Sequence, residues 1–180
     1  MCSSDLGRAA LVAALVLGLL MPLVRFGGEI AGRTLWDHRP MPRERARLLE
    51  AIRARTASDE PIFVWGYYPE LYVLAPRRPA SRYSNANYLT GMLPWENHQP
   101  GVDTSAHVVP GAWDVLMAEL EAVRPPLIVD TAVGDHRYYA KYPIAAFPRL
   151  RDFLDRHYTR VTVVDDGRGR PVAALWRLRS

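Results

Sequence analysis

The chain has 180 residues, of which 49% are apolar and 23% charged, and this composition excludes a disordered protein and fits one globular domain with a short appendage. The formal net charge is +4, but the 23 basic residues are scattered along the chain and Lys141 is the only lysine, so no basic patch indicates a nucleic-acid-binding protein. The single cysteine, Cys2, excludes an internal disulfide and a thiolate metal site.

Residues 9–24 form a run of 16 residues without a charged side chain. A helix needs about 20 apolar residues, and at least about 17, to cross a bilayer, so the run is slightly short. A secretory signal is disfavoured because the chain begins with the acidic MCSSD and the run ends without a small-residue cleavage site. A buried core helix is the alternative, but no other segment is patterned to cover a helix that is apolar all round. We therefore predict a transmembrane helix over residues 7–26, with the lipid bilayer as its partner.

The first six residues, MCSSDL, have an unusual explanation. The codons TGC TCT TCC GAT CT encode Cys-Ser-Ser-Asp-Leu and match the end of a common sequencing adapter. If the initiating Met is encoded by GTG, we expect residues 1–6 to be artefactual, the genuine sequence to start around Gly7, and the chain to be the downstream piece of a longer reading frame. The short apolar run is then a final membrane helix that has lost its first turn.

Residues 27–42 are rich in glycine and proline and predict a juxtamembrane linker. Trp36 suits the headgroup region, although packing on the protein's own domain explains it equally well.

The rest of the chain, residues 43–180, alternates between helical and strand patterns. Its helical segments repeat apolar residues three and four apart, whereas PIFVWG and LIVDTAV are continuous apolar runs, typical of strands covered on both faces. We predict helices over 43–60, 69–75, 113–123 and 147–158, strands over 61–66 and 127–133, and two strands within 159–179 joined by a turn at 165–169.

Two segments lack a clear pattern. Residues 81–91 show a weak alternation that fits either a strand or an extended loop, and residues 94–111 form the longest irregular stretch. A loop of that length in a compact domain is either functional or mobile. The order of elements predicts an α/β domain with three layers and a mostly parallel sheet that ends in a C-terminal hairpin, preceded by one transmembrane helix.

Few side chains point to chemistry. Tyr67 and Tyr68 follow the first predicted strand, where ligands of α/β sheets often bind, but packing and turn roles are the plainer explanation. Asp130, Asp135 and His136 follow a later strand and are candidates for acid–base catalysis, although helix caps and turns use the same residues. The chain has no phosphate-binding glycine loop, no G-x-S-x-G and no histidine spacing typical of a metal site. We therefore predict no catalytic residue, no metal and no cofactor.

Several segments together resemble a known family: IFVWGYYPELYVLAPRRPASRY, RPPLIVDTA, FPRLRDFLDRHYTRV and the final ALWRLR, all after a membrane span. This order is similar to the soluble C-terminal domain, with the last transmembrane helix, of polytopic bacterial glycosyltransferases of the dolichyl-phosphate-mannose mannosyltransferase and aminoarabinose-transferase-like family.

The resemblance implies transfer of a sugar from a polyprenyl-phosphate donor at the bacterial inner membrane. The family's catalytic carboxylates lie in early loops that precede this region, so no catalytic residue carries over and this chain alone is expected to be inactive. The tail would contribute by binding the acceptor or by packing over the membrane half, with five candidate binding residues: Tyr67, Tyr68, Arg82, Tyr83 and Asn85. The lipid-linked sugar or acceptor would be a partner through the missing membrane portion.

The orientation of the soluble domain is a separate question. The family topology places it outside the cytoplasm, whereas the arginines that follow the span favour the cytoplasmic side. We expect the extracytoplasmic side, because earlier helices normally set the orientation. Two alternatives stay open, namely a single-pass protein with an extracytoplasmic binding module, and a cytoplasmic α/β enzyme that uses Asp130 or Asp135.

Overall fold

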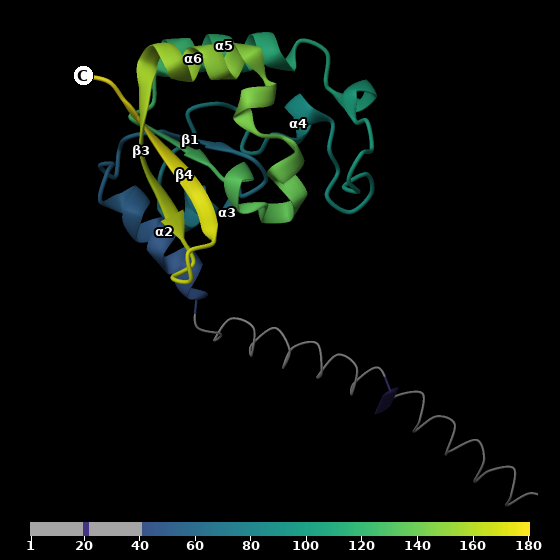
Figure 1. Cartoon of the computed structure of the whole chain (residues 1–180), viewed down its shortest axis with the longest axis horizontal. Coiled ribbons are helices and arrows are strands. Elements are labelled where there is room, and N and C mark those ends of the chain that lie inside the picture. Colours follow the sequence, from purple (N-terminus) through teal and green to yellow (C-terminus); the bar gives the residue numbers. More distant parts are fainter. Residues whose placement is uncertain (1–19, 22–40) are drawn as a thin grey trace, which may run out of the picture. The chain divides into compact units, whose positions relative to one another are not determined.

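The computed structural model describes Leu20, Met21 and residues 41–180 (Figure 1). Residues 1–6, most of the predicted membrane helix over 7–26 and most of the linker over 27–42 lie outside the described residues; Leu20 and Met21 are helical. Among the residues that are described, no helix combines the length and the apolarity that a membrane crossing needs. Pro42–Ser180 forms one compact unit.

The first helix of this unit, α2 (Arg43–Arg53), begins directly after Pro42. Glu44 lies in its first turn and Arg53 in its last, which complements the helix dipole. One face is apolar and fully buried, and each such side chain contributes about 1.5–3 kcal/mol relative to exposure. The buried residues are Leu48, Leu49 and Ile52. This is the surface helix that the sequence predicts, although it ends earlier than residue 60.

Four strands form one sheet in the order β1-β2-β4-β3. They are β1 (Ile62–Trp65), β2 (Leu127–Asp130), β3 (Tyr158–Asp165) and β4 (Pro171–Leu178). β1 and β2 pair in parallel, whereas β4 pairs antiparallel with both β2 and β3. The prediction of a mostly parallel sheet is therefore wrong, and the fold is a mixed α/β fold with a mixed sheet. The C-terminal hairpin is present, but its second strand lies beside β2, so both neighbours of β4 run against it.

Helices pack on both faces of this sheet. In β1, Ile62 and Val64 point into one hydrophobic core, and Phe63 and Trp65 point into a second core on the opposite face. Side chains of α2 and α3 (Glu70–Leu74) belong to the first core, and those of α5 (Ala112–Val123) and α6 (Pro148–His157) to the second (Figure 1). All of β1 and β2 is buried, as their continuous apolar sequences predict.

The segment 81–91 forms neither a strand nor a fully extended loop. It contains the short helix α4 (Asn87–Thr90). This helix begins where Oδ1 of Asn85 accepts the N–H of Asn87 at 3.1 Å, and it ends at Gly91, whose φ of 68° is left-handed. Four residues are too few to show a helical period, so the turn at Asn85 before the helix and Gly91 after it, rather than a hydrophobic pattern, define this helix.

Residues 94–111 are irregular apart from one 3₁₀ turn, η1 (Ser105–His107). The N–H of Val109 donates to the carbonyl of Tyr88 at 2.9 Å, which ties this long loop to α4. Three further 3₁₀ segments connect β2 to α6, namely η2 (Ala132–Gly134), η3 (His136–Lys141) and η4 (Ile144–Ala146).

Candidate functional site

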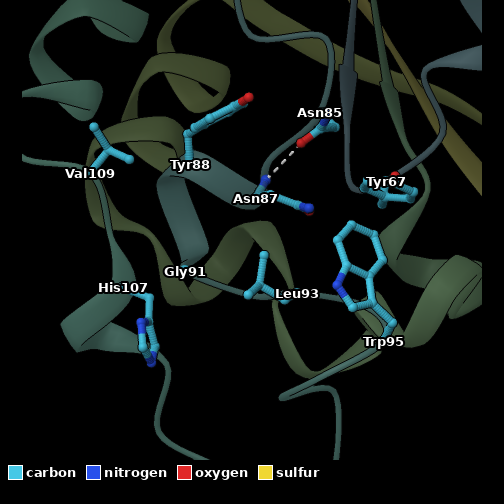
Figure 2. A pocket seen from close by; sticks show the side chains of 9 residues that line it. All are labelled: Tyr67, Asn85, Asn87, Tyr88, Gly91, Leu93, Trp95, His107 and Val109. Carbon is cyan, nitrogen blue, oxygen red and sulfur yellow. Dashed lines mark hydrogen bonds between the residues drawn. The ribbon is translucent and has the colours of Figure 1, made fainter.

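A cavity of about 500 Å³ opens between the end of β1, the helix α4 and the long irregular loop. Its size is within the usual range for small-molecule sites. Figure 2 shows the side chains that line it: Tyr67, Asn85, Asn87, Tyr88, Gly91, Leu93, Trp95, His107 and Val109. The long irregular stretch 94–111 therefore supplies one wall of the cavity, through Trp95, His107 and Val109.

The glycine after β1 determines how the chain reaches this cavity. Gly66 has a φ of +114°, and a Cβ atom there would lie 2.2 Å from Oγ1 of Thr131. Its carbonyl accepts the N–H of Ala86 at 2.8 Å. The tight turn at Gly66 thus fixes the segment before α4 against the end of β1, which brings Asn85 to the same side as Tyr67.

Two asparagine amides face the cavity with their nitrogens available. Oδ1 of Asn85 accepts the N–H of Asn87, and Oδ1 of Asn87 accepts the hydroxyl of Tyr139 at 2.5 Å. Within residues 41–180, neither Nδ2 atom has a hydrogen-bond partner. In Figure 2 the amide of Asn87 is directed toward the side of the cavity where Tyr67 and Trp95 lie. Each amide therefore presents two N–H donors to a ligand.

A buried layer of hydroxyl groups supports these amides. Tyr139 is fully buried, and burial raises its pKa, so its hydroxyl keeps its proton and donates to Asn87. Oγ1 of Thr104 contacts the hydroxyl of Tyr142 at 2.6 Å and donates to the carbonyl of Thr90. These bonds attach the long loop to α4 and to the residue that follows η3, so three separate segments are joined beneath the cavity.

The loop that carries Trp95 has its own internal bonds. Oδ1 of Asn97 accepts the N–H of Leu93 at 2.6 Å, and its Nδ2 donates to the carbonyl of Gly91 at 3.1 Å. The ammonium group of Lys141 donates to the carbonyl of Asn97 at 3.2 Å. The position of Trp95 is therefore set by its neighbours, although its own side chain is 70% exposed.

The lining combines aromatic and aliphatic surface with neutral polar groups. Tyr67, Tyr88 and Trp95 supply three aromatic rings, and among the residues that the structure describes no Asp, Glu, Lys or Arg lines the cavity. His107 is the only imidazole in the lining. Such a surface favours an uncharged ligand with an apolar face and several hydroxyl groups.

Two of the five sequence candidates, Tyr67 and Asn85, line this cavity, whereas Tyr68 does not. Tyr68 is 5% exposed. Its hydroxyl accepts a hydrogen bond from the Nε–H of Arg45 at 2.7 Å, and its ring stacks on that of His136 with centroids 3.7 Å apart. Burial raises the pKa of Tyr68. This tyrosine thus packs between α2 and η3 and is a structural residue in this arrangement.

The candidates Arg82 and Tyr83 also lie outside the cavity lining. Nε of Arg82 forms an ion pair with Glu119 at 2.6 Å, on an exposed surface. The ring of Tyr83 is tilted against that of Tyr88, with centroids 5.7 Å apart. Tyr83 therefore packs against Tyr88, which lines the cavity. Arg82 joins the segment before α4 to Glu119 of α5.

The three acid–base candidates are not gathered at one site. Asp130 is 4% exposed, and its Oδ1 accepts the N–H of Ala132 at 3.0 Å; burial raises its pKa to about 6. Asp135 is exposed and accepts the N–H of Ala140, while His136 is stacked on Tyr68. None of the three lines the cavity. Over the described part of the chain, no group of three or more His, Cys, Asp or Glu side chains could hold a metal ion.

Sequence reasoning missed the other polar and aromatic groups of the cavity, chiefly Asn87, Trp95 and His107. Two signals pointed toward them: the Asn-Ala-Asn repeat at 85–87, and the length of the irregular stretch 94–111. Neither signal specifies which side chains point inward.

Comparisons of this chain with protein-family models, with curated proteins and with solved structures found no match.

Proposed function

We propose that this chain is the C-terminal part of a membrane glycosyltransferase that takes a sugar from a polyprenyl-phosphate donor, with its catalytic membrane portion outside this chain. In this proposal the domain over residues 43–180 binds a neutral sugar unit of the acceptor. The observation that carries the proposal is the cavity lined by Tyr67, Trp95 and the amides of Asn85 and Asn87.

The lining matches the chemistry of a pyranose ring. A pyranose has patches of C–H groups that pack on the faces of aromatic rings, and a rim of hydroxyl groups that accept and donate hydrogen bonds. The rings of Tyr67 and Trp95 suit the C–H patches. The amide nitrogens of Asn85 and Asn87, which have no partner within residues 41–180, suit the hydroxyl groups. A charged sugar would find no countercharge from residues 41–180, because none of their acidic or cationic side chains lines the cavity.

The apolar run over residues 9–24 supports the membrane part of the proposal. We place this run in the bacterial inner membrane as a helix over 7–26, followed by a linker and a three-layer α/β domain on the extracytoplasmic side. There the domain would meet acceptors built outside the cytoplasm, and the bilayer and the lipid-linked sugar would be the partners.

Sugar binding tests the role of the cavity directly. The full chain, held in a detergent whose headgroup is not a sugar, is titrated with methyl α-D-mannopyranoside, methyl α-D-glucopyranoside, glucosamine and glucuronate, followed by saturation-transfer NMR. We expect millimolar binding of the neutral glycosides, which corresponds to about −4 kcal/mol, and weaker binding of the charged sugars.

Variants assign that binding to the cavity. Trp95→Ala and Asn87→Ala should each weaken it about tenfold or more. Tyr138→Ala removes a similar aromatic ring that is half-exposed but lies outside the cavity lining, and it should leave binding unchanged. Equal sugar binding by the native chain and the Trp95→Ala variant would remove the proposal for the cavity.

The membrane part has an independent test. Genomic DNA upstream of the codon for Gly7 should continue the reading frame through several apolar spans. An in-frame stop directly before that codon would instead leave a single-pass protein whose domain is a binding module. If the full chain and a version without residues 1–26 partition equally into the aqueous phase, the membrane assignment of residues 7–26 is wrong.

A further inference from the structure

A second hollow, which shares no residue with the sugar cavity, lies between α2 and the turn of the β3–β4 hairpin. Its volume is about 400 Å³. Figure 1 shows the hairpin turn beside α2. The residues that line it are Arg43, Glu44, Arg47, Asp166, Gly167, Arg168 and Arg170. We call this hollow the arginine groove.

The arginine groove holds four guanidinium groups, two of which are already paired. Nη1 of Arg47 contacts Asp165 at 3.0 Å, and Nε of Arg170 contacts Asp166 at 2.7 Å. Over the described part of the chain, Arg43 and Arg168 have no carboxylate within ion-pair distance. Two guanidinium groups are therefore available to a ligand.

The carboxylates at the arginine groove reduce its positive charge but do not neutralise it fully. Asp166 is occupied by its pair with Arg170 and by the N–H groups of Arg168 and Arg170, and these bonds keep its pKa low despite some desolvation. Glu44 is the one lining carboxylate with no ion-pair partner among the described residues. With Asp165, which pairs with Arg47 from just outside the lining, four cations face three carboxylates, so one positive charge is left in excess.

The turn itself is rigidly placed against the helix. Gly167 has a φ of +84°, and a Cβ atom there would lie 3.2 Å from Cζ of Arg47, so the guanidinium group lies directly over the turn. The N–H of Gly167 donates to Asp165 at 2.6 Å. Asp165 and Asp166 occupy the backbone N–H groups of Gly167, Arg168 and Arg170, so at these three positions a ligand is left with the side chains as donors.

We propose that the arginine groove binds a phosphate group, held by Arg43 and Arg168 with Arg47 and Arg170 behind them. Planar guanidinium groups match the oxygens of phosphate in two-pronged hydrogen bonds, and none of the described residues that line the groove has an apolar side chain. Two sources offer the same chemistry: the headgroup of an anionic phospholipid and a soluble phosphate compound. The headgroup source rests on the membrane attachment proposed above, whereas phosphate binding as such does not.

Inorganic phosphate is the first probe. The full chain in an uncharged detergent is titrated with phosphate at an ionic strength of about 0.15 M, so that long-range attraction is screened. Saturable binding is expected, and the Arg43→Gln/Arg168→Gln variant should bind about tenfold or more weakly. The matched control is Arg137→Gln/Arg177→Gln, which removes the same charge from two exposed arginines outside the groove and should bind as the native chain does.

Nanodiscs separate the two sources. The full chain is reconstituted in phosphatidylcholine alone or with added phosphatidylglycerol, and the rates of phenylglyoxal modification at Arg43 and Arg168 are compared with those at Arg137 and Arg177. Protection of the groove arginines by phosphatidylglycerol, several-fold beyond that of the controls, assigns the phosphate to a headgroup. Lack of protection together with binding of free phosphate assigns it to a soluble compound.

One pattern overturns the proposal. If phosphate does not saturate the native chain, or if both double variants weaken its binding equally, the groove is not a phosphate site. Neither result affects the sugar cavity, because methyl α-D-mannopyranoside binding and its loss in Trp95→Ala are measured in the same detergent without phosphate. Failure of the groove and failure of the proposed function are therefore distinguished.

Discussion

Tyr139 donates a hydrogen bond of 2.5 Å from its hydroxyl to Oδ1 of Asn87, so a fully buried residue of η3 fixes an amide that faces the cavity. An asparagine amide that is held at its oxygen turns its nitrogen the other way. The contact thus decides which end of the Asn87 amide a ligand meets, and it couples sugar binding to a core residue that the ligand does not touch.

Removing that hydroxyl should weaken both the fold and ligand binding. Tyr139→Phe leaves Oδ1 of Asn87 without its donor and frees the amide to rotate, so we expect a loss of about 1–2 kcal/mol in the free energy of unfolding and about a tenfold weaker affinity for methyl α-D-mannopyranoside. Chemical denaturation, monitored by tryptophan fluorescence, measures the free energy of unfolding. Saturation-transfer NMR measures the affinity for the glycoside.

Tyr158→Phe is the matched control. The hydroxyl of Tyr158 is also buried and donates to the carbonyl of Pro125 at 2.8 Å, outside the cavity lining. This variant should lose a similar free energy of unfolding and keep its affinity for the sugar. If both variants bind the glycoside equally well, the orientation of Asn87 has no role in recognition.

Gly91 should be indispensable to the cavity for a steric reason. Its φ of +68° suits glycine, and a Cβ atom would lie 2.1 Å from the carbonyl oxygen of Thr104. Gly101 has a similar φ of +79° with no atom within 4 Å of its would-be Cβ. We expect Gly101→Ala to cost about 1 kcal/mol of unfolding free energy from backbone strain, and Gly91→Ala about 3 kcal/mol or more because the loop must also shift.

The difference between these two glycine variants isolates the contact between α4 and the long loop. Gly91→Ala should also reduce sugar binding, since Trp95 and His107 lie on the loop that is displaced. If the unfolding free energies of the two variants agree within about 0.5 kcal/mol, the loop can move away from a Cβ atom at position 91 without loss of stability.

The elements that local pattern predicts are the ones that the structure confirms. Helices α5 and α6, strands β1 and β2, and the C-terminal hairpin follow from hydrophobic period, continuous apolar runs and a glycine-rich turn, all of which are properties of contiguous residues. The mixed sheet could not be predicted in this way, because one neighbour of β4 is β2, which lies more than 40 residues earlier in the chain. No local signal specifies that pairing, and the prediction of a mostly parallel sheet failed there.

The residues of the cavity could be predicted only in part, because contacts between distant segments determine where several of them lie. Tyr67 follows a recognisable strand and glycine turn, so its position near a ligand site is foreseeable. Its neighbour Tyr68 points into the core toward Arg45, a direction that depends on the backbone angles of the turn. Trp95 and His107 belong to a stretch without period, whose course is set by contacts with Thr90, Tyr142 and Lys141.

Asp130 should make the protein less stable as pH rises. Burial raises its pKa to about 6 in the folded chain, against about 3.9 when unfolded, so between those values the native state binds more protons and the free energy of unfolding falls with increasing pH. The fall is at most on the order of 3 kcal/mol. Asp130→Asn keeps an oxygen for the N–H of Ala132 but does not titrate, so at pH 7 it should be more stable than the native chain.

His136 has the opposite effect over nearly the same range. Burial, and next the charge of Arg137, lower its pKa to about 4, against about 6.5 when unfolded. The unfolded state therefore binds more protons between those values, and stability is lost as pH falls through them. His136→Phe keeps a ring to stack on Tyr68 and removes the titration.

The two residues together make a prediction that neither makes alone. Because their effects have opposite sign and similar size, the native chain should show only a shallow change in unfolding free energy between pH 4 and about 6.5. Asp130→Asn should then show stability that rises with pH across this window, His136→Phe stability that falls, and the double variant no slope from either residue. Urea denaturation at closely spaced pH values measures all four profiles, and two single variants with slopes of the same sign would contradict the assignment of both shifts to burial.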